Sequence, residues 1–347
     1  VHTLSQEATD LYEQARITLQ KHFNAKHAYE IIFTSGTTHS INMVASGFSS
    51  MLKKGDEIIV SALEHHSNIV PWQMLCEKTG AELKVIPMNE EGSLIMSEYD
   101  KLLSENTKLV FCNHISNALG TINPIEEIIK KAHLVGAAVL IDGAQSTPHM
   151  KVDFQNLDVD FYVTSAHKIC GPTGVGLLYG KQEWLEKLPP YQGGGEMIDT
   201  VTFEKTTYAG LPHKFEAGTP NICGGIAFGV AIDYMNTIGF DAIGIYEQEL
   251  LAYGTQELLK IDGVRIYGTA HKTSVISFNV AEIHPYDIGS ILDKLGIAVR
   301  TGHHCAQPIM EFYKIPGTVR ASFAFYNTKE EIDVFIKGLQ KTIMMLG

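Results

Sequence analysis

The sequence predicts an α/β protein with a mainly parallel sheet, followed by a smaller α+β unit. Short apolar runs alternate with helical patterns in the first part of the chain, which is typical of a parallel sheet with helices on both faces. One run, residues 137–141, is apolar throughout, as expected for a strand that is buried on both faces. The length of 347 residues leaves room for a second, smaller domain.

We expect the large domain to occupy residues 1–235. It opens with a helical repeat of apolar positions over residues 8–24, and a glycine-rich connection covers 192–218, a length that favours a functional loop. Strands are expected at 31–34, 58–60, 83–87, 108–113, 137–142, 161–165 and 175–179, and helices after 35–38, near 72–78, at 125–135 and at 226–238.

The smaller domain is expected over residues 236–347. The helices and strands expected there together suggest a smaller α+β domain. Helices are expected at 244–260, 285–295 and 328–345, and strands at 264–267 and 274–280.

Composition excludes several classes of partner. The net charge of -12 and the pI near 5.7 argue against nucleic acid and against an anionic membrane surface. The apolar runs are too short to span a bilayer, and no charged segment followed by an apolar one opens the chain to mark it for export. Five scattered cysteines without a Cys-x-x-Cys pair fit a reducing compartment, so we expect a cytoplasmic protein.

An aspartate and a lysine end two strands of the predicted sheet. Asp142 follows the run 137–141 directly, and Lys168 follows the strand 161–165. The carboxyl ends of strands in an open α/β sheet form the edge where ligands bind. A carboxylate and a lysine at that edge suit pyridoxal phosphate (PLP), because the lysine amine bonds to the cofactor and the carboxylate keeps its pyridine nitrogen protonated.

The same pair could instead be a structural ion pair near a turn. Lys168, however, precedes the glycine-rich stretch 171–176, where the backbone can approach a ligand closely. A lysine in apolar surroundings has a lowered pKa, which makes its amine a better nucleophile. These features favour the cofactor.

A phosphate site is indicated where the strand 31–34 gives way to a helix. Ser35-Gly36-Thr37-Thr38 would expose free backbone N–H groups and the positive end of a helix dipole. Ser and Thr also favour helix N-caps, so this motif alone is equally consistent with a cap. Ser165 and His167, beside Lys168, could donate to the same phosphate.

Two histidines follow the strand 58–60 in Glu64-His65-His66-Ser67-Asn68. Adjacent histidines point in different directions, so we expect no metal site here. An imidazole can instead stack on an aromatic cofactor and shuttle protons, although a histidine in a loop is more often just an exposed polar side chain. Gln145, three positions after Asp142, could reach the phenolic oxygen of the cofactor, or it could be an ordinary N3 residue in the first turn of a helix.

Cys305 lies in Arg300-Thr301-Gly302-His303-His304-Cys305-Ala306, on a predicted loop with an arginine and two histidines nearby. Such surroundings favour the reactive thiolate, whereas most cysteines are small buried apolar residues. The latter description fits Cys76, Cys112, Cys170 and Cys223. Arg320, which we expect to end a short strand, could bind a substrate carboxylate or form a surface ion pair.

Together these segments resemble the cysteine desulfurases of the class V aminotransferase superfamily, and most closely the SufS-type (group II) branch, which includes selenocysteine lyases. The resemblance runs from Val1 to Gly347 and is most specific around Lys168 and Cys305. It is carried by the segments 34–38, 64–72, 114–120, 142–145, 165–168, 215–221 and 300–306.

The resemblance implies PLP-dependent fold type I, with a seven-stranded type of sheet in the large domain, and it implies roles for residues at matching positions. Lys168 would be the cofactor-bound lysine, Asp142 the partner of the pyridine nitrogen and Cys305 the nucleophile that removes sulfur. His65 would stack on the ring, and Gln145 would touch its phenolic oxygen. The phosphate would be held by Thr37, Ser165, His167 and Thr219 of the partner subunit, and the substrate carboxylate by Asn117, Arg320 and nearby Arg300.

The implied reaction converts L-cysteine to L-alanine and leaves a persulfide on Cys305. The persulfide would pass to an acceptor protein of SufE or SufU type for iron–sulfur cluster assembly, and the enzyme would be a homodimer. Family members usually begin several tens of residues earlier, so we expect an N-terminal segment of the family to be absent. Selenocysteine lyase, with L-selenocysteine as substrate, and a shortened PLP-binding form without turnover are the alternatives.

Overall fold

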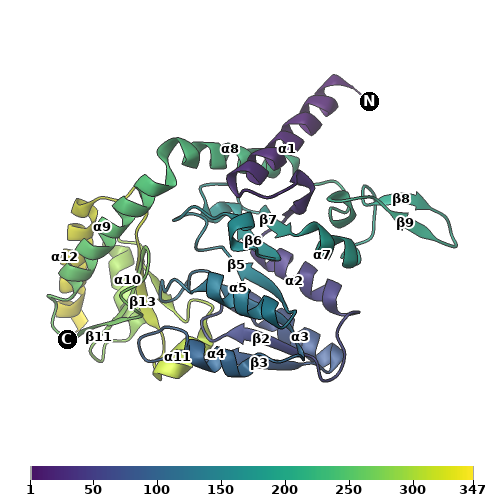
Figure 1. The fold of residues 1–347 in the computed structure, drawn as a ribbon. Helices are drawn as coiled ribbons and strands as arrows, with labels where there is room; N and C mark the ends of the chain where they lie inside the picture. The colour runs from purple at the N-terminus through teal and green to yellow at the C-terminus, as the bar shows by residue number, and fades with distance from the viewer. Residues whose placement is uncertain (1, 347) are drawn as a thin grey trace.

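The computed structural model describes residues 2–346, and its centre is a seven-stranded sheet (Figure 1). The strand order is β1-β7-β6-β5-β4-β2-β3. The strands are β1 (Ile31–Thr34), β2 (Glu57–Ser61), β3 (Glu82–Ile86), β4 (Thr107–Asn113), β5 (Ala138–Asp142), β6 (Phe161–Ser165) and β7 (Gly176–Gly180).

The sheet is mainly parallel, as the sequence predicted. β3, β2, β4, β5 and β6 pair in parallel, whereas β7 is antiparallel to both β6 and β1. The connection from β6 to β7 contains only a short 3-10 turn, η3 (Ala166–Lys168), and no crossover helix. A parallel pairing needs such a crossover, so the chain returns in the opposite direction.

Alternate residues of each strand enter two separate hydrophobic cores. In β4, Val110 faces one core and Phe111 faces the other, and the neighbouring β5 behaves in the same way at Val139 and Leu140. The first core is completed by α1 (Thr3–His22), α4 (Met96–Leu102), α5 (Ile125–Leu134), α6 (Phe154–Leu157), α8 (Ile222–Ile238) and α11 (Gln307–Tyr313). The second is completed by α2 (Thr37–Phe48), α3 (Val70–Thr79) and α7 (Gln182–Lys187).

A four-stranded antiparallel sheet, in the order β10-β11-β13-β12, lies in the C-terminal part of the chain. The helices packed on it share a third core with residues such as Leu250, Phe278 and Phe335. The elements are α9 (Phe240–Leu258), β10 (Val264–Tyr267), β11 (Val275–Val280), α10 (Pro285–Lys294), β12 (Arg300–Gly302), β13 (Thr318–Ser322) and α12 (Lys329–Leu346).

The chain bends by 73° between α8 and α9, at Gly239. This bend lies close to the predicted domain boundary at 235/236, which stays a prediction. None of the described helices is by itself long and apolar enough to cross a membrane, and α8 and α9 meet that requirement only when taken together.

Several short elements were not predicted. They include α4, α7 and α11, which have about two turns each and too few residues for a clear helical period. The connection 192–218 contains a hairpin, β8 (Ile198–Val201) and β9 (Thr206–Tyr208), that projects from the rest of the chain in Figure 1. Arg320 lies in the middle of β13 rather than at its end.

The prediction that four cysteines are buried was wrong for two of them. Cys112 is buried and Cys76 is partly buried, but Cys170 and Cys223 are exposed. Cys170 has φ +61° and lies in the turn that follows η3, so its side chain is turned outward. Cys223 lies in the first turn of α8, on the side away from the core.

A buried ion pair joins α1 to the segment that precedes α8. The Arg16 guanidinium, which is only 1% exposed, lies 2.7 Å from Glu216 Oε1. Arg16 also donates to the Ile31 carbonyl at 2.7 Å, and the Phe33 N–H donates to Glu216 at 2.8 Å. Because a buried charge must be paired, these contacts fix residues 213–217 against β1.

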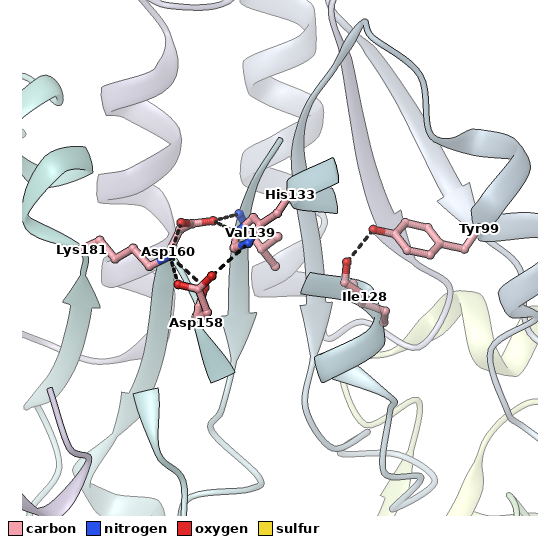
Figure 2. A network of polar contacts seen from close by, with 7 residues as sticks. All are labelled: Tyr99, Ile128, His133, Val139, Asp158, Asp160 and Lys181. Atoms are coloured by element: carbon pink, nitrogen blue, oxygen red, sulfur yellow. Dashed lines mark hydrogen bonds and ion pairs between the residues drawn. The ribbon is translucent and has the colours of Figure 1, made fainter. Parts of the chain in front are cut away.

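A second polar network holds the end of the sheet opposite the strands' C-termini (Figure 2). Asp160, just before β6, accepts from the Val139 N–H of β5 and from His133 Nε2 of α5, both at 2.8 Å. Lys181, just after β7, lies 3.1 Å from Asp160 and 2.6 Å from Asp158. One carboxylate therefore ties together β5, β6, β7 and α5.

Replacing His133 by glutamine should cost about 1.5–3 kcal/mol of stability at about pH 5.5 and less at about pH 8.5. The hydrogen bond to Asp160 raises the pKa of His133. Burial would raise the pKa of Asp160, but His133 and Lys181 outweigh it and lower that pKa, so the carboxylate stays charged. The charged imidazole therefore stabilises the fold fully below the unfolded histidine pKa of about 6.5, and this contribution is lost as the pH rises through the folded value.

Urea unfolding of the unmodified chain and of His133→Gln, at about pH 5.5 and about pH 8.5, measures the loss of stability at each pH. His271→Gln, a change at an exposed histidine, is the control and should show no such pH dependence. Equal losses for His133→Gln at both pH values would show that the imidazole charge does not contribute.

Candidate active site

Asp142 and Lys168 lie at the carboxyl end of the sheet, as predicted. Asp142 is the last residue of β5 and is buried, and Lys168 ends η3, directly after β6. The Ala144 N–H donates to Asp142 Oδ1 at 3.0 Å. Because β5 and β6 are neighbouring parallel strands, both side chains start from the same edge.

Lys168 is exposed and Asp142 is buried, yet the pKa values of both groups are shifted from their ordinary values. Burial raises the pKa of Asp142 to about 6, against the opposing effects of the Ala144 N–H and the Lys168 charge. Desolvation lowers the pKa of Lys168, where the charge of Asp142 opposes and those of Arg320 and Arg300 assist the change. A buried carboxylate with so few donors fits a cationic partner such as a protonated pyridine nitrogen.

The predicted phosphate residues Thr37 and Ser165 are in direct contact. Ser165 Oγ accepts from the Thr37 N–H at 2.9 Å and lies 2.8 Å from Thr37 Oγ1, at the N-terminus of α2. Gly36 has φ +141°, and a Cβ on Gly176 would lie 2.5 Å from the Gly36 Cα. Only glycine fits at 176, so the turn before α2 sits directly against β7.

His167 and Thr219 are placed less tightly. Both are exposed, and within residues 2–346 neither forms a hydrogen bond with Thr37 or Ser165. Thr219 follows Glu216, the buried partner of Arg16, so the ion pair fixes the base of its loop. The roles of His167 and Thr219 in phosphate binding stay predictions.

His65 is a neutral imidazole with a defined tautomer. Its Nδ1 accepts from the Ser67 N–H at 3.1 Å, so the ring proton lies on Nε2. Desolvation, followed by the charges of Lys168, His66 and Arg300, lowers its pKa to about 4. A neutral, flat ring near Lys168 is suited to stack on a cofactor ring. Gln145 lies half-buried in the turn after Asp142, and its predicted role is untested.

Glu64, which the sequence analysis did not identify as important, fixes the 64–68 loop to the sheet. It is fully buried and accepts from the Asn113 N–H at 2.8 Å and from Asn68 Nδ2 at 2.6 Å, and it also contacts Ser61. Burial raises its pKa to about 8, although these hydrogen bonds act in the opposite direction. The sequence offered one sign of this role, because Glu64 is a charged residue directly before the two histidines.

Cys305 lies between β12 and α11, with Arg300 Nη2 3.5 Å from its Sγ. An arginine thus lies beside the thiol, and its role in favouring the thiolate stays a prediction. The expectation that both histidines help is wrong for His304. Desolvation and the charges of Arg320 and Arg300 lower the pKa of His304 to about 3, so it is neutral, and its Nε2 is bonded to Thr318 Oγ1 at 2.8 Å. His303 is exposed.

Buried Asn117 and partly buried Arg320 form one cluster. Arg320 Nη1 donates to the Asn117 carbonyl at 2.7 Å, and Asn117 Nδ2 donates to the His304 carbonyl at 2.6 Å. Among the described residues, Arg320 Nε and Asn117 Oδ1 are buried without a partner. Burial, followed by the charge of Arg300, lowers the Arg320 pKa to about 10. Two guanidinium groups with an unused buried donor fit an anionic ligand such as a carboxylate.

The sequence of residues 1–335 matches the family described as Aminotransferase class-V. The chain belongs to this family. It is 51% identical over 349 residues to the cysteine desulfurase of Cronobacter sakazakii, and 49% identical over 348 residues to the probable cysteine desulfurase of Halalkalibacterium halodurans. Each alignment covers 100% of this chain and 86% of the relative.

Solved structures agree with this family. The crystal structure of the cysteine desulfurase CsdA from Escherichia coli matches with a TM-score of 0.96 and 37% identity, over 100% of this chain and 88% of that one. The apo cysteine desulfurase from Thermococcus onnurineus also has a TM-score of 0.96, with 40% identity, over 100% and 87%. These matches confirm the predicted fold class and the resemblance to cysteine desulfurases. The family and the Lys168–Asp142 arrangement indicate PLP as the cofactor.

In the cofactor-free chain, Lys168 should react with acetic anhydride at a lower pH than an ordinary lysine, because desolvation lowers its pKa. Asp142→Asn should move the midpoint of the reaction lower still, since it removes the charge that raises the Lys168 pKa. Peptide mass spectrometry over a pH series measures the rate, with exposed Lys205 as the reference. A Lys168 midpoint at or above the ordinary lysine value of about 10.4 would contradict this account.

Proposed function

We propose that the chain is a PLP-dependent cysteine desulfurase that converts L-cysteine to L-alanine and leaves a persulfide on Cys305. The observation that carries the proposal is the position of Cys305, 3.5 Å from Arg300 and within the electrostatic reach of Lys168. Transamination alone would have no use for a thiol beside an arginine at this point. The names of the relatives support the same activity.

The residues that would hold the cofactor are those the sequence indicated. Lys168 would bind it covalently, Asp142 would face its pyridine nitrogen, and His65 and Gln145 would contact its ring. The phosphate would be held by Thr37, Ser165, His167 and the partner subunit's Thr219. When bound, PLP withdraws electrons from the α-carbon of an amino acid substrate.

Lys168 and the two arginines would bind the substrate and remove its α-proton. Arg320, with Arg300 and Asn117, would hold the substrate carboxylate and so orient the α-carbon hydrogen. The Lys168 amine has a lowered pKa, which leaves more of it neutral and able to take that hydrogen as a proton. Asp142 is buried, so its carboxylate would meet the cofactor's pyridine nitrogen with little competition from water.

Cys305 performs the sulfur transfer. Its thiolate attacks the substrate sulfur, a new S–S bond forms, and the bond between that sulfur and the substrate β-carbon breaks. The electron pair of the broken bond stays with the carbon skeleton, which takes up a proton and leaves as L-alanine. The charge of Arg300 stabilises the attacking thiolate.

Further assignments belong to the same proposal. The chain would be a SufS-type (group II) enzyme, would act as a homodimer, and would pass the persulfide to an acceptor of SufE or SufU type for iron–sulfur cluster assembly. A cytoplasmic location stays a prediction, which the five free thiols support.

The alternative activity is that of a selenocysteine lyase. Selenium leaves carbon more readily than sulfur does, so that reaction would depend less on Cys305. The third reading, a PLP-binding form without turnover, would keep the cofactor site and lack alanine release.

The purified, PLP-loaded chain with a thiol reductant should release L-alanine from L-cysteine over many turnovers. Cys305→Ala should reduce this rate about a thousandfold or more, because it removes the nucleophile. The control is Cys223→Ala, which replaces an exposed cysteine in α8 and should be unchanged.

Three outcomes decide between the readings. Full activity of Cys305→Ala would overturn the nucleophile assignment. Lost activity on L-cysteine with retained activity on L-selenocysteine would assign both reactions to the chain. Bound cofactor without alanine from the unmodified chain would favour the form without turnover.

A further inference from the structure

The two adjacent histidines of the 64–68 loop serve different partners. His65 lies close enough to Lys168 for the lysine charge to lower its pKa. His66 turns toward the Cys305 loop, and the two ring centroids are 6.3 Å apart with planes inclined at 48°. No function described above accounts for His66.

His66 holds the Cys305 turn at two points. Its backbone N–H donates to the Cys305 carbonyl at 2.7 Å, and its Nε2 accepts from the Gln307 N–H at 3.0 Å. A backbone N–H can only donate, so this bond requires Nε2 to be unprotonated and the ring proton to lie on Nδ1. The imidazole is thus the acceptor for the first N–H of α11, a group that no preceding helical turn can satisfy.

The turn needs such support because its backbone is strained. His304 and Cys305 have φ of +55° and +56°, two consecutive residues with side chains in the left-handed region. Each such residue costs of order 1–3 kcal/mol and persists only where its surroundings fix it. The contacts that fix these two residues from outside the turn include those of His66, the 2.6 Å bond from Asn117 Nδ2 to the His304 carbonyl and the 2.8 Å bond between His304 Nε2 and Thr318 Oγ1.

His66 is itself rigidly placed. It begins the 3-10 turn η2 (His66–Asn68), and Asn68 is buried between the Glu64 carboxylate and the Trp72 indole, at 2.6 and 3.0 Å. Trp72 stacks on Phe111 of β4, with ring centroids 3.4 Å apart. The position of His66 is therefore set by the core of the seven-stranded sheet and not by the small sheet that carries Cys305.

We propose that His66 is a positioning residue for Cys305: its imidazole holds the turn 305–307 against the seven-stranded sheet and so fixes the distance from the thiol to the substrate sulfur. This inference rests on the proposed function, because it concerns how the nucleophile of that reaction is held. The loop 64–68 then positions the cofactor-facing His65 and the nucleophile from consecutive residues.

The test replaces the imidazole while keeping the backbone N–H. His66→Ala should lower kcat for L-cysteine about tenfold to a hundredfold with KM little changed, since the thiol is displaced but the carboxylate site is untouched. His66→Gln should recover most of the loss, because Oε1 of glutamine can accept from the Gln307 N–H. Gln307→Ala keeps that N–H and should match the unmodified chain.

A second measurement uses the cofactor-free chain and does not depend on turnover. Amide hydrogen exchange at Gln307 should be at least tenfold faster in His66→Ala than in the unmodified chain, and close to unchanged in His66→Gln. If His66→Ala does not fold, His66→Asn, which is too short to reach Gln307, replaces it.

The two results together keep the inference separate from the proposed function. Unchanged Gln307 exchange and unchanged kcat in His66→Ala would overturn the role of His66. Failure of His66→Gln to restore either quantity would show that the ring acts only by filling space. If the unmodified chain releases no alanine, the proposed function fails, whereas the exchange rates of Gln307 still decide whether His66 holds the turn.

Discussion

Burial of carboxyl groups at the carboxyl ends of parallel strands is the constraint on which this molecule depends. A parallel sheet is covered by helices on both faces, so polar groups that follow its strands are cut off from water. Asp142 after β5 and Glu64 after β2 are both in this position, and burial raises the pKa of each. The two carboxyl groups differ in their hydrogen-bond partners. Glu64 is satisfied by neighbouring donors and is structural, whereas Asp142 retains capacity for a charged partner.

The lowered pKa of Lys168 depends on this arrangement. Desolvation and two arginines favour its neutral form, and the Asp142 carboxylate opposes them. The arginines come from β12 and β13 of the small sheet, where Arg300 pairs with Arg320 across the ladder. Residues of both sheets therefore set the pKa of the Lys168 amine, and neither sheet alone would give the same value.

The sequence predicted the central sheet well because each buried strand is a continuous apolar run with a polar group at its end. The positions of Asp142 and Lys168 at the edge of this sheet followed from the same pattern, since each comes directly after a buried apolar run. The short helices could not be predicted, because two turns carry too little periodicity. Exposure of Cys170 and Cys223 depends on a turn and on a helix face that no local pattern specifies.

Contacts between distant segments were also beyond local patterns. Nothing near His304 in the chain indicates that its ring binds Thr318 and is neutral, and nothing near Glu216 points to Arg16, which lies 200 residues earlier. Such pairs are determined by the packing of whole elements. They turned out to fix the loops that carry Thr219 and Cys305.

The packing of α11 restricts how the molecule can move. Ala306, Ile309 and Met310 follow Cys305 directly, yet they belong to the core beneath the seven-stranded sheet and are at most 1% exposed. Rotation of the small sheet away from the large one would have to leave this stretch behind or expose it, at a cost of about 1.5–3 kcal/mol for each large side chain. Cys305 is therefore tied through α11 to the same core that β5 and β6 enter, although β12 belongs to the small sheet.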